Sequence, residues 1–172
     1  MKLKHTLLLS CLAIATCASF AANAQDAANI DDTSMATTPR LDPTAPNPAP
    51  AHPELAGALK DFGGKEGLTA IVATFMDNMM ADPRTQPFFA NVDRERVKRE
   101  LSEQFCVILG GDCVYSGRDM RTTHAGLQID RNNFNALVED LQHAMDTHKV
   151  PFRSQNKLLA ILAPMHREAV TR

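Results

Sequence analysis

Apolar residues recur with helical spacing through residues 68–165, and this periodicity constrains the fold more than any other feature. In four segments they fall at positions i, i+3 and i+4, as on one face of an amphipathic helix. The four stripes are Leu68, Ile71, Val72, Phe75, Met76, Met79 and Met80; Val97, Leu101, Phe105 and Ile108; Phe134, Leu137, Val138, Leu141 and Met145; and Leu158, Ile161, Leu162 and Met165. We find no convincing strand pattern, so the chain is expected to be all-α.

Turn and capping residues set the expected ends of these helices. Asp82-Pro83 ends the first, and Gly110-Gly111 stops the second, which begins near Asp93. Asp130 is a suitable N-cap for the third helix. The fourth starts near Ser154, and Pro164 should bend it.

A short segment between the second and third helices carries the residue of greatest chemical interest. Over residues 118–127, Met120, His124 and Leu127 are spaced to share one apolar face. An isolated histidine on such a face is more often a hydrogen-bonded core residue than a metal ligand. A role for His124 therefore depends on its context.

The first 24 residues have the layout of a secretory signal peptide. Lys2 and Lys4 precede a short apolar run, and Ala22-Asn23-Ala24 follows as a cleavage site. We expect cleavage after Ala24 and a periplasmic or secreted protein, without a membrane span in the mature chain. Cleavage changes the formal net charge from −2 to −4, which gives no indication of a nucleic-acid partner.

Two further regions complete the expected organisation. Residues 25–57 are rich in Pro, Asp, Thr and Ala, and are predicted to be a flexible linker. Residues 58–172 form a single domain of ordinary size.

Motifs that connect the helices occur in the order found in one known family. They are Phe62-Gly63-Gly64, Asp82-Pro83-Arg84, Pro87-Phe88-Phe89, Leu109-Gly110-Gly111, Tyr115-Ser116-Gly117-Arg118-Asp119-Met120, His124-Ala125-Gly126-Leu127 and Leu162-Ala163-Pro164. In order and spacing this set resembles the truncated haemoglobins of group I, over nearly all of residues 60–170. The resemblance implies a two-over-two helical sandwich around haem b.

The resemblance also implies a set of haem-binding residues. His124 matches the proximal histidine that ligates the iron, and Phe89 matches the phenylalanine that wedges against the haem. Met120 and Leu127 would pack on the same side as His124. The whole expected set is His124, Phe75, Met76, Phe89, Val97, Leu101, Phe105, Met120 and Leu127.

The expected ligand side departs from the family pattern. Members usually carry a tyrosine where Met76 stands, and a glutamine or another polar residue where Leu101 stands. With Val97 and Phe105 as their neighbours, these side chains offer no useful hydrogen-bond donor. The resemblance therefore implies reversible binding of O₂, CO and NO with weak stabilisation of O₂. Enzymatic turnover is not the leading expectation.

Three alternative functions remain open, two of which use the same haem. An NO-detoxifying dioxygenase or a peroxidase-like enzyme would need a reductase, since the chain has no nicotinamide- or flavin-binding motif. An electron-transfer protein would need a second axial ligand such as Met76. A helical interaction domain without haem is a further alternative.

Two expectations concern residues around the site. Cys106 and Cys113 flank the Gly-Gly turn and are expected to form a disulfide after export, the alternative being two free thiols. Four cations are candidates to pair with the haem propionates: Lys98, Arg99, Arg118 and Arg121.

Overall fold

Helices make up all of the regular structure over residues 44–172, which are the residues that the computed structural model describes. The elements in chain order are η2 (Pro53–Leu55), α1 (Ala56–Leu59), η3 (Lys60–Phe62), α2 (Gly64–Ala81), α3 (Gln86–Phe89), α4 (Arg94–Ile108), α5 (Met120–His124), α6 (Arg131–Thr147), α7 (Phe152–Leu162), η4 (Ala163–Met165) and α8 (His166–Ala169). The all-α prediction is confirmed. The expected signal peptide lies outside the described residues.

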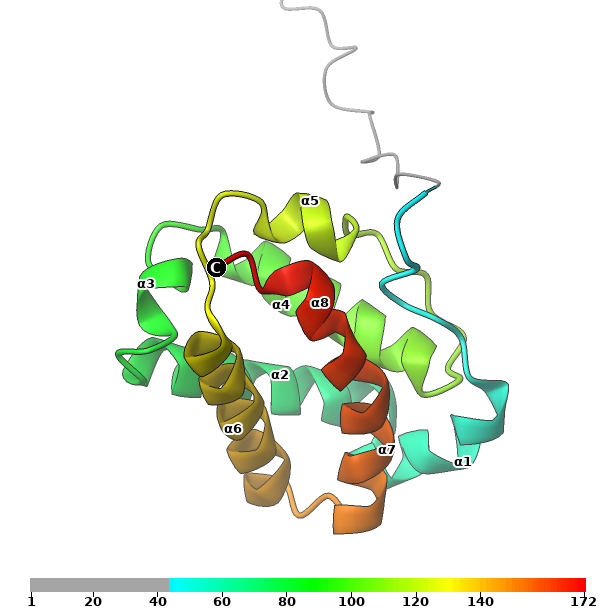
Figure 1. Cartoon of the computed structure of the whole chain (residues 1–172). Coiled ribbons are helices and arrows are strands. Elements are labelled where there is room, and N and C mark those ends of the chain that lie inside the picture. The colour runs from blue at the N-terminus through cyan, green and yellow to red at the C-terminus, as the bar shows by residue number, and fades with distance from the viewer. Residues whose placement is uncertain (1–43) are drawn as a thin grey trace, which may run out of the picture. The chain divides into compact units, whose positions relative to one another are not determined.

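Two helical layers form the two-over-two arrangement of the domain. α2 packs against α4 and also against α6, and α7 contacts both α4 and α6. In Figure 1, α6 and α7 run across the pair formed by α2 and α4. Completely buried side chains from three of these helices, Val72, Leu141 and Leu158 among them, fill the space between the layers.

Local sequence signals explain where the helices begin and end. Asp130 caps α6 by accepting a hydrogen bond from the backbone N–H of Asn133, and the side-chain oxygen of Asn133 accepts one from the backbone N–H of Asp130. Pro164 is expected to bend the last helix; in the structure α7 ends at Leu162 and continues as a 3₁₀ turn that contains Pro164.

The segment before α1 lies closer to the domain than its composition indicates. Pro48 and Ala49 are buried, and the carbonyl oxygen of Pro48 accepts a hydrogen bond from Gln104. Gly110 has φ +72°, and a Cβ there would lie 2.7 Å from the carbonyl oxygen of His52. Helical structure already begins at Pro53, within residues 25–57, where the linker is expected.

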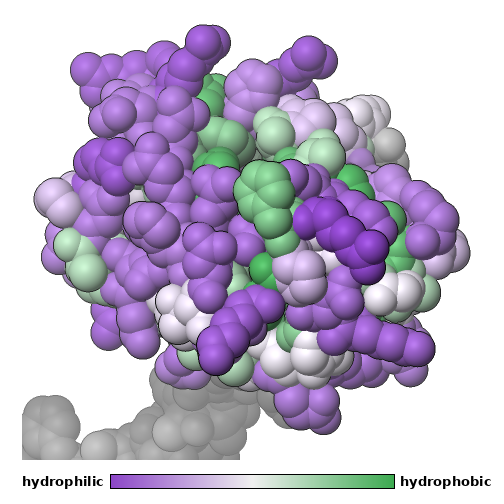
Figure 2. Space-filling view, turned by 90° about the horizontal axis from the view of Figure 1, so that it is seen from below, coloured by the Kyte–Doolittle hydropathy of each residue, from purple (hydrophilic) through white to green (hydrophobic). Residues whose placement is uncertain are grey.

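Figure 2, which views the molecule from below, shows a mostly hydrophilic face with scattered hydrophobic side chains, as is usual for a protein surface. Among the described residues, no helix combines the length and apolar character that a membrane span requires.

Candidate functional site

A cavity of about 440 Å³ opens between the helices and collects most of the predicted site residues. Its size lies within the usual range for small-molecule and cofactor sites. Eight of the nine predicted residues line it: Phe75, Phe89, Val97, Leu101, Phe105, Met120, His124 and Leu127. Leu127 is 41% exposed and therefore lies where the cavity meets solvent.

His124 is held in an orientation suited to metal ligation. It is the last residue of α5, a helix capped by the Asp119 carboxylate, which accepts from the backbone N–H of Thr122. Its Nδ1 lies 2.7 Å from the carbonyl oxygen of Met120. Because a carbonyl only accepts, Nδ1 carries the proton and Nε2 keeps a free lone pair. Burial lowers the pKa of His124, which favours the neutral imidazole that ligates metals.

Met76 is the one predicted site residue that does not line the cavity. Its side chain is 3% exposed and packs in the hydrophobic core, whereas its neighbour Phe75 faces the cavity. Successive residues on an α-helix point about 100° apart, and at this place on α2 that step carries Met76 away from the cavity wall. The expectation that Met76 contacts a ligand in the cavity is not supported by its position.

Further lining residues were not assigned to the site from the sequence. α6 contributes Phe134, Leu137 and Leu141, and α7 contributes Leu159 and Leu162. All of these except Leu159 belong to the apolar stripes, but a stripe indicates a buried face without showing whether a core or a cavity lies opposite.

Of the four cations expected near the propionates, Arg118 is the one that lines the cavity. Arg96 lines it as well, and its guanidinium forms an ion pair with Glu100 at 3.0 Å. Arg121 instead pairs with Glu168. Arg96 and Arg118 are therefore the arginines placed to pair with negative groups of a cofactor bound in the cavity.

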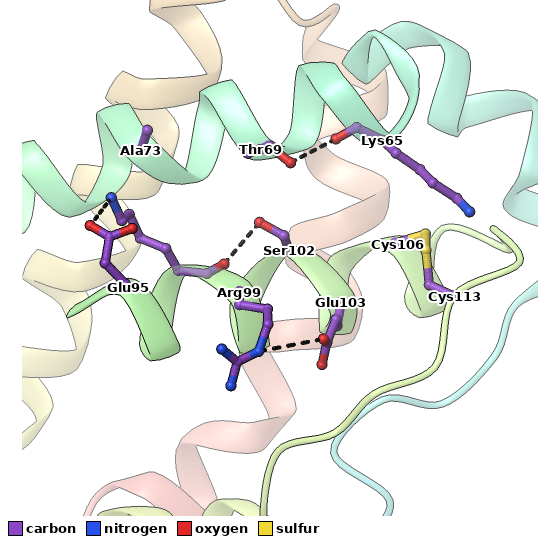
Figure 3. A pocket seen from close by; sticks show the side chains of 10 residues that line it. Lys65, Thr69, Ala73, Glu95, Arg99, Ser102, Glu103, Cys106 and Cys113 are labelled. Carbon is purple, nitrogen blue, oxygen red and sulfur yellow. Dashed lines mark hydrogen bonds and ion pairs between the residues drawn. A yellow bond between two sulfur atoms is a disulfide. The ribbon is translucent and has the colours of Figure 1, made fainter. Parts of the chain in front are cut away.

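Lys98 and Arg99 line a separate groove between α2 and α4, of about 350 Å³. Both are paired with carboxylates of α4: Lys98 with Glu95, and Arg99 with Glu103, as Figure 3 shows. Their predicted role as partners of the propionates is not supported, because the groove is not the cavity that His124 lines.

The cysteine pair lies at one end of this groove (Figure 3). The structure pairs the sulfur atoms of Cys106 and Cys113, with the Cα atoms 5.9 Å apart. That separation falls within the range of about 4.4–6.8 Å found for disulfides. The pairing ties the end of α4 to the loop that leads to α5 and His124.

Tyr115 closes one side of the cavity from this loop. Its hydroxyl donates to the carbonyl oxygen of Arg118 at 2.8 Å. Burial, together with the nearby carboxylates of Glu100 and Glu103, raises the pKa of Tyr115 to about 12. The phenol therefore stays protonated at physiological pH and can donate to the Arg118 carbonyl.

The residues present fit an iron porphyrin. The walls are mostly apolar side chains, which suit the macrocycle; one imidazole among the described lining residues is available for the metal, and two arginines can meet carboxylates. The donor set therefore agrees with the cofactor that the sequence resemblance implies.

Comparison with known proteins gives the same result. A family model of bacterial-like globins matches residues 58–171. Group 1 truncated hemoglobin of Tetrahymena pyriformis is 30% identical over 80 residues, 46% of this chain and 66% of that protein. The match therefore spans slightly less than two thirds of that relative. Group 1 truncated hemoglobin LI410 of Chlamydomonas moewusii is 34% identical over 109 residues, 60% of each chain.

Solved structures share the fold. Truncated hemoglobin from Tetrahymena pyriformis in its Fe(III) form superposes with a TM-score of 0.64 at 23% identity, covering 67% of this chain and 98% of that one. The 2/2 hemoglobin from Synechococcus sp. PCC 7002 superposes with a TM-score of 0.62 at 21% identity, with the same coverage. At these identities the likeness establishes the fold.

Proposed function

The chain belongs to the bacterial-like globin family, as a group I truncated globin, and from this we propose that it binds haem b through His124 and reversibly binds O₂, CO and NO. The observation that carries the proposal is an imidazole on the wall of an apolar cavity, with Nδ1 fixed by the Met120 carbonyl. This leaves Nε2 for the iron. When bound, the haem iron supplies the position at which the gas is held.

Three apolar side chains of α4 on the cavity wall bear on which gas is favoured. Val97, Leu101 and Phe105 line the cavity and donate no hydrogen bond. A hydrogen-bond donor on this wall would stabilise O₂ more than CO, because O₂ is the more polar ligand in such a site. We therefore infer weaker retention of O₂ than in family members with two distal donors.

The electron-transfer alternative has less support. It needs a second protein ligand, and the proposed candidate Met76 lies in the core instead of on the cavity wall. The NO-dioxygenase alternative uses the same cavity and requires an external reductase. Turnover of NO with a supplied electron donor distinguishes it from reversible binding.

We also propose that the protein is exported and that Cys106 and Cys113 stay oxidised. The charged start, the short apolar run and Ala22-Asn23-Ala24 support export. The pairing of the two cysteines suits an oxidising compartment. The intact mass of protein isolated from a periplasmic fraction tests this: a chain that begins at Gln25 is expected, and retention of Met1 contradicts cleavage.

Haemin titration of the apo-protein tests the proposed cofactor. We expect saturation at one haemin per chain, and much weaker binding by His124→Ala. The control is His143→Ala, which removes an exposed imidazole of α6 that does not line the cavity. Equal haemin affinity of His124→Ala and wild type contradicts the assignment of the ligand.

A further inference from the structure

The loop between α4 and α5, residues 112–118, carries part of the cavity wall but has little regular structure of its own. Tyr115 and Arg118 from this loop line the cavity. Among the described residues, no member of the loop takes part in a backbone–backbone hydrogen bond. Val114 is 83% exposed and does not anchor the loop by burial. A segment with so few buried contacts and backbone hydrogen bonds opens readily unless side chains hold it.

Two polar contacts between described residues join this loop to the neighbouring helices, and both lie at the surface. Lys65 of α2 pairs with Asp112 at 2.6 Å, and their side chains are 53% and 92% exposed. Ser116 donates from its backbone N–H and from its hydroxyl to the carboxylate of Glu103 in α4, again in exposed positions. Exposed charged contacts contribute little, because water and salt screen them. These contacts alone therefore hold the loop weakly.

The bond between Cys106 and Cys113 ties the same loop to the core (Figure 3). Cys106 belongs to α4, is 2% exposed and is part of the hydrophobic core. Cys113 lies in the loop, two positions before Tyr115. Unlike a surface ion pair, this bond opens only by exchange with a thiol or by reaction with another reductant. It is therefore the tie that fixes the loop most firmly.

The rest of the loop forms a compact unit behind this tie. The Tyr115 ring lies on Gly117, where a Cβ would overlap it, and the Tyr115 hydroxyl donates to the Arg118 carbonyl at 2.8 Å. The next residue, Asp119, is 3% exposed and caps α5, the helix that carries the proposed iron ligand. The position of the bonded end of the loop is therefore transmitted to Arg118 and to the start of α5.

We propose that the Cys106–Cys113 bond is a positioning element of the haem site: it holds Arg118 on the cavity wall, and the chain retains haem tightly only when the bond is formed. The proposal rests on the haem binding and the export proposed above. The bond forms when the two thiols pass two electrons and two protons to a disulfide-bonded oxidant, which is released as two thiols. Disulfides form and persist outside the cytoplasm. Tight retention of haem is thereby coupled to export.

The rate at which haemin passes from the protein to excess apomyoglobin, followed by absorption, tests this proposal. Cys113→Ser breaks the bond and leaves the buried position 106 unchanged. We expect haemin loss about fivefold faster than from wild type, which corresponds to the loss of one exposed charge pair. Wild-type apo-protein that is reduced with a phosphine, freed of the reductant and loaded with haemin without oxygen should match the variant, and it decides the matter if the variant does not fold. A wild-type rate in the reduced protein overturns the proposal and leaves the globin function intact.

Combining Cys113→Ser with Arg118→Gln separates positioning from a general structural effect. In the bonded protein Arg118→Gln should also speed haemin loss about fivefold. In Cys113→Ser the same change should add little, because Arg118 is no longer held on the wall, so additive effects overturn the proposal. Arg121→Gln is the matched control, since Arg121 pairs with Glu168 and does not line the cavity. It should leave the rate unchanged, and an effect equal to that of Arg118→Gln contradicts the role of Arg118.

Gln155→Met controls for lost stability. Gln155 is 3% exposed, and its amide donates to Asp146 and to the carbonyl oxygen of Val150. It does not line the cavity. This variant should unfold at a lower urea concentration than wild type without losing haemin faster. Haemin loss as fast as that of Cys113→Ser would show that general destabilisation is the cause and overturn the proposal. Failure of wild type to bind haemin overturns both this inference and the proposed function.

Discussion

The ring Nδ1 of His124 lies 2.7 Å from the carbonyl oxygen of Met120, one turn earlier in α5. This contact fixes the ring without a charged partner, and burial is the main cause of the lowered pKa of His124. A lowered pKa means that the unfolded chain binds a proton to this residue more readily than the folded chain does.

The stability of the apo-protein should therefore fall in part because of His124 as the pH drops below about 6.5, the ordinary pKa of histidine. His124→Leu removes this contribution. Its free energy of unfolding, measured with urea at pH 7.5 and pH 5.5, should change less than that of wild type. An equal change in both proteins would show that His124 titrates normally in the fold.

Leu101→Gln should slow O₂ release by placing an amide on the cavity wall, one turn after Val97. One hydrogen bond to a partly charged ligand corresponds to roughly a tenfold decrease in the dissociation rate. Stopped-flow mixing of the O₂ complex with CO measures it. Lys98→Gln is the control, because Lys98 lines the groove between α2 and α4, and an equal effect there would contradict the placement of Leu101.

Removing the link between Cys106 and Cys113 should destabilise the protein. The two residues are separated by 7 positions, and the entropy of closing so short a loop corresponds to about 2 kcal/mol. The double variant Cys106→Ser/Cys113→Ser should unfold at lower urea concentration than wild type. Dithiothreitol should remove the difference, and a difference that persists would indicate that the serines, not the missing bond, cause it.

Gly67→Ala should be strongly destabilising, by about 2 kcal/mol or more, because a Cβ at this position overlaps the carbonyl oxygen of Phe62. Gly57→Ala is the matched control, since a Cβ there meets no atom within 4 Å and Ala is favoured in a helix. Thermal unfolding of the two variants should give a lower Tm for Gly67→Ala alone. Similar Tm values would contradict the close approach at Gly67.

The helices and the ligand residue could be predicted because their signals are local or carried by motifs. The stripe through Leu137 and Leu141 predicts α6, and Asp130 predicts its first residue, since capping depends on neighbours within one turn. His124 was found from its place among the family motifs, and the structure puts it on the cavity wall.

Other features depend on tertiary contacts that sequence spacing does not contain. The rotation of α2 about its own axis places Phe75 on the cavity wall and Met76 only in the core. Two adjacent positions in a sequence do not reveal that rotation. The burial of the segment at Pro48 depends on a contact with Gln104, 56 positions away in the chain. The composition of residues 25–57 alone predicts a flexible segment.

The absorption spectrum of the purified full chain, in ferric, ferrous and ferrous CO forms, tests the central claim most directly. We predict a broad five-coordinate ferrous band that sharpens when CO is added, is lost in His124→Ala and is kept in His143→Ala. A six-coordinate low-spin ferrous spectrum that resists CO, or a His124→Ala spectrum identical to that of wild type, would contradict an open haem site held by His124.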